Sequence, residues 1–197
     1  MTVNAVLATL RHAWLSLESL NKPMAVMGGI ALSAWQYVRA TQDVDLLVAI
    51  EGAQIPALID HLGRRGFQPK RSPPVLTLND FQLIQFTYQL PGSHLDLQLD
   101  VLTGASDFQR TALGRAIRMK LPDLDLEPAV LTCEDLILFK LLAGRIIDLG
   151  DCAGLLKANV ATIDRTYLAQ WSKRLGLSAE FAEVWKNTLP DETPPVP

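Results

Sequence analysis

The sequence has few of the features that mark membrane or secreted proteins. Its longest uncharged stretch of interest, residues 23–38, contains two glycines and is shorter than the roughly 20 apolar residues that span a bilayer. Arg11, His12 and Glu18 interrupt the N-terminal apolar pattern, where a secretory signal needs an unbroken apolar core. We therefore expect a cytoplasmic protein that has no membrane partner.

The sequence also has only two cysteines and no net positive charge. Cys133 and Cys152 have no Cys-x-x-Cys spacing and no neighbouring histidine, so we expect reduced thiols. The formal net charge of −3 excludes a global attraction to nucleic acid, so a polyanion would need a local arrangement of residues to bind it. Hydrophobic residues at 49% and charged residues at 20% are typical of a globular protein with a buried core.

The first two thirds of the chain mix helix and strand patterns. Apolar spacing predicts helices over residues 2–20, 30–38 and 53–65. Strands are predicted at 24–27, 44–50, 67–70, 75–78, 81–90 and 95–102, with turns at Pro73-Pro74, Asn79-Asp80 and Pro91-Gly92. These elements predict a mixed sheet of about five strands.

The last third is predicted to be helical, with segments near 134–147, 151–158, 164–175 and 178–189. Four prolines after Leu189 favour a disordered tail. The predicted organisation is therefore an α+β core with an N-terminal helix over 1–130, a helical subdomain over 131–189 and a tail over 190–197.

Two carboxylates stand at the start of the most apolar predicted strand. Asp43 and Asp45 are two residues apart, so on a strand they share a face at about 6 to 7 Å. Burying two such anions requires a divalent cation or a cationic partner. Because Mg²⁺ is usually held by one or two carboxylates together with substrate phosphates, the pair suggests Mg²⁺ or Mn²⁺ and phosphate chemistry.

Two further features fit this chemistry. Gly28-Gly29 ends a predicted strand and opens a helix, where bare backbone can approach a phosphate closely, although it can equally be a simple turn. The alternating segment 94–102 places Asp96, Gln98 and Asp100 on one face. Asp100 is the better candidate for a third carboxylate, and the contribution of Asp96 stays open.

Basic side chains offer candidate phosphate contacts. If one helix continues through Asp151, then Lys140, Gly144, Asp148 and Asp151 form one stripe, from which Lys140 could face a triphosphate or cover apolar surface with its stem. Arg39 could contact a phosphate or pair with an acid. Arg145 and Asp148, three residues apart, are expected to pair structurally.

Together these residues resemble the nucleotidyltransferase superfamily of the DNA polymerase β type. Gly28-Gly29, a spacer over residues 30–42, Asp43-x-Asp45 and a later strand aspartate carry this resemblance. Over residues 24–156 the chain looks like AbiEii-type nucleotidyltransferases, which include toxins of bacterial toxin–antitoxin systems. The motifs behind this closer likeness are Gly-Gly-x-Ala-Leu, Arg39-x-Thr41-x-Asp43-Val-Asp45-Leu-Leu, Asp100-Val-Leu, Glu134-Asp135-Leu-Ile, Lys140, Arg145, Asp148 and Asp151.

The resemblance implies specific roles for these residues. Asp43, Asp45 and Asp100 would bind metal, Asp100 would also activate the acceptor hydroxyl, and Gly28 and Gly29 would hold the triphosphate of an NTP. Many superfamily members have Ser where this chain has Gly29, so a hydroxyl contact to phosphate is missing. The implied activity is transfer of a nucleoside monophosphate to RNA or protein, by a toxin with a cognate antitoxin. A small-molecule transferase of the aminoglycoside type and a noncatalytic antitoxin-like binding module are the alternatives.

Overall fold

The computed structural model describes residues 2–78 and 81–195. Side chains are described from Ala5 onward in the first helix. The turn predicted at Asn79-Asp80 and the last two residues of the predicted tail lie outside the described residues. None of the described helices is long and apolar enough to cross a bilayer.

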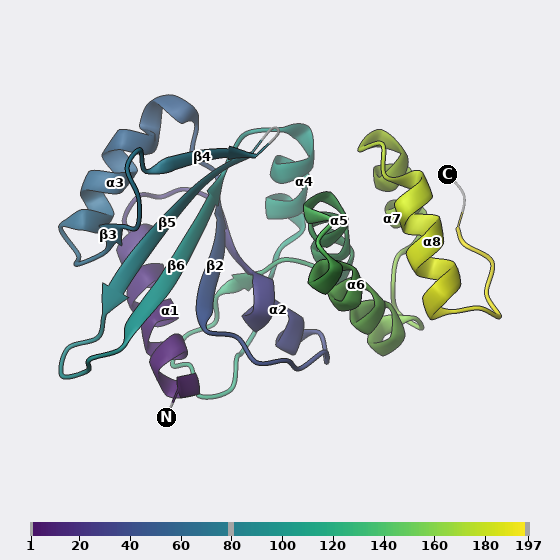
Figure 1. Ribbon diagram of the computed structural model, residues 1–197, viewed down its shortest axis with the longest axis horizontal. Helices are drawn as coiled ribbons and strands as arrows, with labels where there is room; N and C mark the ends of the chain where they lie inside the picture. Colours follow the sequence, from purple (N-terminus) through teal and green to yellow (C-terminus); the bar gives the residue numbers. More distant parts are fainter. Residues whose placement is uncertain (1, 79–80, 196–197) are drawn as a thin grey trace. The chain divides into compact units, whose positions relative to one another are not determined.

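Helices and strands are interspersed in the first part of the chain, and the last part is helical (Figure 1). The helices are α1 (Thr2–Glu18), α2 (Gly28–Ala34), the 3-10 helix η1 (Gly52–Gln54), α3 (Ile55–Gly63), α4 (Asp107–Arg115), α5 (Cys133–Ala143), α6 (Ile146–Asn159), α7 (Arg165–Arg174) and α8 (Ser178–Thr188). The strands are β1 (Met24–Met27), β2 (Asp43–Val48), β3 (Gln68–Pro69), β4 (Val75–Leu78), β5 (Phe81–Gln89), β6 (Asp96–Thr103), β7 (Ile117–Arg118) and β8 (Ala129–Val130).

The described strands form one mixed sheet in the order β3-β5-β6-β2-β1-β8-β7, with β4 also paired to β5. β2 runs parallel to β6 and β1 parallel to β8, whereas β1–β2 and β5–β6 are antiparallel. The predicted mixed sheet within an α+β fold is confirmed. The sheet has eight strands in the described residues, more than predicted, partly because the two-residue strands β7 and β8 are too short to give a periodic signal.

The chain forms two compact units, which we call the sheet unit and the helical unit. The sheet unit comprises the described residues up to Ile30 together with Ala40–Leu131. The helical unit comprises Ala31–Arg39 and the residues from Thr132 onward. The segment Ala31–Arg39, which the sequence analysis assigns to the core, therefore packs with the helical unit.

Along β5 and β6 the core lies on one face of the sheet. Ile84 and Phe86 of β5 and Leu99 and Val101 of β6 are fully buried. His12 of α1 stacks against Tyr88 of β5 at 4.8 Å between ring centroids, so α1 covers this face. The alternate residues of the same strands are therefore left on the opposite face, which carries the polar side chains discussed below.

Two local signals explain differences from the predicted helices. Ser106 and Gln109 form a capping box at the start of α4, a helix the sequence analysis does not predict because its apolar stripe is weak. Gly144 adopts a left-handed conformation, with φ of 64°, that ends α5. The single helix considered through Asp151 is therefore wrong: α5 and α6 are separate helices.

Candidate active site

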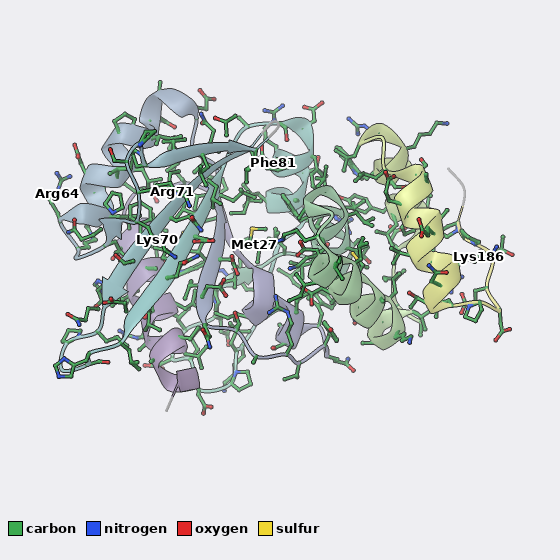
Figure 2. The ribbon with its side chains drawn as sticks, viewed as in Figure 1. Met27, Arg64, Lys70, Arg71, Phe81 and Lys186 are labelled. Carbon is green, nitrogen blue, oxygen red and sulfur yellow. The ribbon has the colours of Figure 1, made fainter. Side chains whose placement is uncertain are left out.

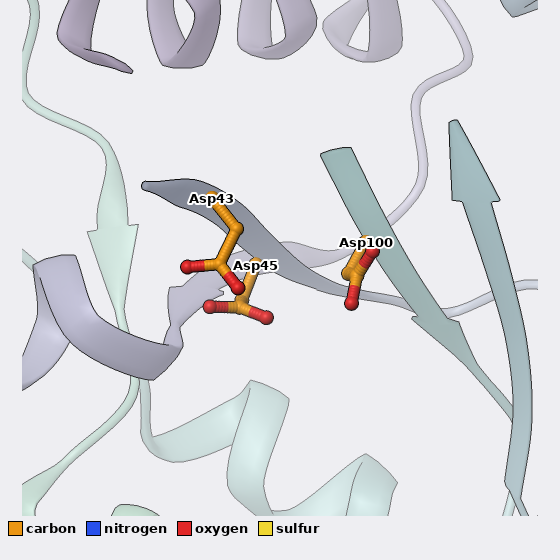
Figure 3. Close-up of side chains that lie close together, drawn as sticks. All are labelled: Asp43, Asp45 and Asp100. Atoms are coloured by element: carbon orange, nitrogen blue, oxygen red, sulfur yellow. The ribbon is translucent and has the colours of Figure 1, made fainter. Parts of the chain in front are cut away.

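Three carboxylates converge on the polar face of the sheet (Figure 3). Asp43 and Asp45 come from β2, and Asp100 of β6 is the direct parallel partner of Asp45. One carboxylate oxygen from each lies within 4.8 Å of the others, and all three residues are partly buried. The structure thus brings together the three aspartates that the sequence analysis selects.

The strand pattern explains why these side chains share a face. Val44 and Leu46 alternate with the two aspartates of β2 and are 1% and 0% exposed. Because burial fixes the orientation of these apolar side chains, a pleated strand must turn Asp43 and Asp45 to the other side. Leu99 and Val101 fix Asp100 in the same way.

The Gly28-Gly29 turn lies directly beside the carboxylates. Gly28 opens α2 with φ of 62°, and a Cβ placed there would lie 1.8 Å from Asp45 Oδ2. A Cβ on Gly29 would lie 2.6 Å from the side chain of Thr41. Both glycines are therefore required by close packing around the site, and Thr41 occupies the space that a side chain at position 29 would need.

Hydroxyl and amide groups contact the carboxylates. Thr41 Oγ1 donates a hydrogen bond to Asp43 Oδ1 at 2.7 Å. Asp100 accepts hydrogen bonds from the side-chain amides of Gln85 and Gln98. Burial raises the pKa of Asp100, and the charge of Asp43 raises it further. The hydrogen bonds from Gln85 and Gln98 and the charge of Lys70 lower this pKa, but the net shift is upward.

The two other predicted nucleotide contacts, Arg39 and Lys140, meet in the helical unit. Lys140 Nζ lies 2.9 Å from Asp148 Oδ1 and 2.8 Å from Asp151 Oδ2, and Arg39 Nε lies 3.0 Å from Asp151 Oδ1. Arg39 therefore pairs with an acid, one of its two expected alternatives. A contact of either cation with nucleotide stays a prediction. The expected pair of Arg145 and Asp148 is present.

The sequence analysis placed Gln98 on the face of Asp100 but assigned no contact with Asp100 to Gln85, Gln98, Lys70 or Arg71. Gln85 is its direct partner across β5–β6, and Gln98 precedes it by two residues on the same face. Lys70 and Arg71 contact these two amides. Asp96, whose role was open, is exposed at the start of β6 and is not part of the acidic group found among the described residues. A glutamine at an alternating position in strand 81–90 was the available signal for Gln85.

The donor set fits a hard divalent cation. Three carboxylates provide oxygen ligands, which Mg²⁺ and Mn²⁺ prefer. Three anions held this close repel one another, and the described hydrogen bonds to Asp43 and Asp100 come from neutral groups. A cation bound among Asp43, Asp45 and Asp100 would relieve this repulsion.

The fold is that of known nucleotidyltransferases. No protein-family model matches the chain, and the search of curated proteins found no match. An antigenic nucleotidyltransferase-like protein from Paracoccidioides brasiliensis is 19% identical, with a TM-score of 0.50 over 92% of this chain and 93% of its own. The antibiotic-resistance factor ANT(2'')-Ia is 13% identical, with a TM-score of 0.56 over 91% of this chain and 97% of its own. At these identities the likeness shows the α+β fold of the DNA polymerase β type.

Proposed function

We propose that this protein is a metal-dependent nucleotidyltransferase that moves a nucleoside monophosphate from an NTP to a hydroxyl acceptor. One observation carries the proposal: Asp43, Asp45 and Asp100 converge beside the Gly28-Gly29 turn, within a nucleotidyltransferase fold. A carboxylate cluster alone would be weak support. Its position in this fold, next to a turn that could hold phosphates, makes transfer the function that the geometry supports best.

Each residue has a distinct role in the proposed reaction. Asp43, Asp45 and Asp100 hold Mg²⁺ or Mn²⁺, and the backbone of Gly28 and Gly29 binds the triphosphate. When bound, the cation would neutralise the negative charge that develops on the phosphates. The acceptor oxygen forms a bond to the α-phosphorus, the bond to the bridging oxygen of the β-phosphate breaks, and pyrophosphate leaves. Asp100 takes the proton of the acceptor hydroxyl at a carboxylate oxygen.

The surroundings of Asp100 favour an RNA or protein acceptor over a polycation. Lys70 and Arg71 are exposed and lie one amide away from Asp100, so they would repel an aminoglycoside at this side of the site. The likeness to ANT(2'')-Ia supports the alternative, a small-molecule acceptor, because that protein is an antibiotic-resistance factor. Membership in the AbiEii family, with a toxin role and a cognate antitoxin, is the more specific form of the proposal.

The test is incubation with each α-³²P-labelled NTP, Mg²⁺ and total cell extract, followed by separation of RNA, protein and small molecules. We expect label in RNA or protein, and an aminoglycoside product would support the alternative. Asp45→Asn should reduce labelling about 10³-fold, because the charge is removed where phosphate charge must be balanced. Persistent labelling in this variant would overturn the proposed mechanism.

A matched control is available in the chain. Asp125 belongs to a second Asp-x-Asp pair, Asp123-Leu124-Asp125, and is exposed outside any helix or strand. Asp125→Asn removes the same charge elsewhere and should label like the wild type. Absence of labelling and of nucleotide binding in the wild type would instead favour the noncatalytic binding module.

A further inference from the structure

Asp100 is held by two side-chain amides on the polar face of the sheet. Gln98 Nε2 donates to Asp100 Oδ1 at 2.8 Å, and Gln85 Nε2 lies 3.3 Å from Oδ1 and 3.2 Å from Oδ2. The two donors approach from different directions, one along β6 and one across from β5. Together they restrict the rotation of the carboxylate about its side chain.

Each of the two amides also accepts a hydrogen bond from a cationic side chain. Lys70 Nζ donates to Gln98 Oε1 at 2.5 Å, and Arg71 Nη2 donates to Gln85 Oε1 at 2.6 Å. Figure 2 shows both cations over the strands of the sheet, apart from Arg64 at the end of α3. The result is two chains of cation, amide and carboxylate that end on the same aspartate.

The chemistry of these groups fixes the direction of each amide. Lysine and arginine side chains can only donate hydrogen bonds, and an ionised carboxylate can only accept them. Each glutamine must therefore turn its carbonyl oxygen to the cation and its NH₂ group to Asp100. A glutamine without its cation would lose this constraint and could turn its amide to other partners.

An amide between cation and carboxylate differs from a direct ion pair in one useful respect. A lysine placed directly on Asp100 would neutralise it and occupy the oxygens that a metal needs. An amide instead orients the carboxylate through one or two N–H groups and leaves it negative, with lone pairs still available. Such an arrangement suits a carboxylate that has to bind something else.

We propose that Gln85 and Gln98 are positioning residues that hold the Asp100 carboxylate in the orientation that faces Asp43 and Asp45, and that Arg71 and Lys70 act on Asp100 through them. The inference rests on the proposed function, because it assigns the orientation of Asp100 to metal binding and transfer. It adds four residues to the site: Gln85 and Gln98, which contact Asp100, and Lys70 and Arg71, which contact these two amides.

The first test is binding of Mn²⁺ alone, followed by the loss of its free electron paramagnetic resonance signal. Gln98→Leu and Gln85→Leu remove the N–H donors at similar volume. Each should weaken Mn²⁺ binding by about 10- to 100-fold, the effect typical of residues that orient metal ligands. In transfer assays the same variants should lower kcat by a similar factor and leave the NTP KM within about twofold, because triphosphate binding lies elsewhere.

Gln89→Leu is the matched control. Gln89 lies on β5 on the same face as Gln85, is exposed and pairs with Asp96 in the strand register. This variant should bind Mn²⁺ like the wild type, and thermal unfolding of all variants would identify any general loss of structure. Wild-type Mn²⁺ binding in Gln85→Leu and Gln98→Leu would overturn the inference and leave the proposed function standing. A wild-type protein that neither binds Mn²⁺ nor transfers label would overturn both.

A double-mutant cycle tests whether Lys70 and Arg71 act on Asp100 through the two amides. At about 0.5 M salt, which screens the loss of the exposed lysine charge, Lys70→Met alone should weaken Mn²⁺ binding severalfold, since the Gln98 amide loses its constraint. Combined with Gln98→Leu, the lysine substitution should add no further loss, because its route to Asp100 is already broken. Arg71→Met with Gln85→Leu should behave in the same way. Losses that multiply in the double variants would show that the cations act independently of the amides and would overturn this step.

Discussion

Each unit contains a cluster of carboxylates, and the surroundings of the two clusters differ. In the sheet unit, Asp100 contacts two amides and Asp43 contacts a hydroxyl group. In the helical unit, Asp148 and Asp151 are almost fully buried and contact cations directly. The helical cluster therefore balances its charge within the chain, whereas the described hydrogen bonds to Asp43 and Asp100 come from neutral groups.

One carboxyl group in each cluster has a shifted pKa, and the shifts of Asp148 and Asp100 have opposite directions. For Asp148, burial alone would raise the pKa, but hydrogen bonds and charges from Arg145 and Lys140 outweigh it, and the pKa is lowered. For Lys140, burial alone would lower the pKa, but Asp151 and Asp148 raise it. The raised pKa of Asp100 shows the reverse balance, in which burial prevails over the amides.

The largest expected effect is a difference in the free energy of unfolding between a variant of the helical cluster and a variant of the sheet cluster. Lys140→Met leaves two buried carboxylates without their shared cation and should lower the free energy of unfolding by about 3 to 5 kcal/mol. Asp43→Asn relieves repulsion among the three carboxylates and should cause no loss of stability in metal-free protein. Urea unfolding in EDTA measures both. A comparable loss in Asp43→Asn would remove the distinction between the clusters.

Gly28→Ala tests how tightly the sheet cluster is packed. The new Cβ would meet Asp45 Oδ2 at 1.8 Å and Asp45 Cβ at 2.7 Å, at a left-handed φ. We expect a loss of about 1 to 3 kcal/mol together with weaker Mn²⁺ binding, because Asp45 must move. Gly114→Ala is the control: no atom lies within 4 Å of its Cβ, and alanine in this helix should be neutral or stabilise by about 0.5 to 1 kcal/mol. Equal Mn²⁺ binding in the two variants would contradict the packing argument.

The pH dependence of stability should have opposite signs at the two clusters. The lowered pKa of Asp148 means that its ionised form stabilises the fold above the unfolded pKa, near 3.8, and that this is lost as pH falls through the lower folded pKa. The raised pKa of Asp100 means that the folded state holds its proton more tightly, so stability is gained as pH falls through the folded value.

Unfolding free energies of metal-free protein between about pH 3 and pH 7 test both signs. The stability difference between the wild type and Asp148→Asn should shrink toward the acidic end. As the pH falls over the same range, the wild type should become more stable relative to Asp100→Asn. Parallel pH profiles for the two variants would show that the clusters do not differ in this way.

The smallest effect is expected at an exposed cation of the helical cluster. Arg145 contacts Asp148 at 2.5 Å, but its side chain is 71% exposed, compared with 12% for Lys140. Arg145→Gln should therefore cost less than about 1 kcal/mol. A loss equal to that of Lys140→Met, measured by urea unfolding, would show that exposure does not determine which cation balances the cluster.

The sequence was sufficient to predict the strand face that each of the three aspartates occupies, because that depends on local alternation, whereas the place of Asp100 beside Asp45 depends on the pairing of β2 with β6. Period-two burial fixes the face of Asp43 and Asp45, and the alternation of 94–102 does the same for Asp100. The strands over 24–102 were predicted close to their observed bounds for the same reason. The weak stripe of α4 and the very short strands β7 and β8 gave no comparable signal.

Apart from Gln98, the groups around Asp100 could not be placed beside it from the sequence, because their positions depend on register. Gln85 meets Asp100 only through the pairing of β5 with β6, and Lys70 reaches Gln98 only because β3 pairs with β5. Lys140 contacts Asp148 and Asp151, although Gly144 ends α5 and the three residues do not lie on the single continuous helix that the sequence analysis considered. Neither relation can be read from sequence spacing alone.

The helical unit consists of two stretches that are separated in the chain by all of Ala40–Leu131, so neither unit is a continuous piece of polypeptide. Asn159 Nδ2 donates to the carbonyl of Trp35, and the ring of Tyr37 lies against Gly154. During synthesis, Ala31–Arg39 leaves the ribosome well before these partners exist. Truncation after Leu131 would remove both Asn159 and Gly154, so a fragment that ends there keeps Ala31–Arg39 but lacks the part of the helical unit against which it packs.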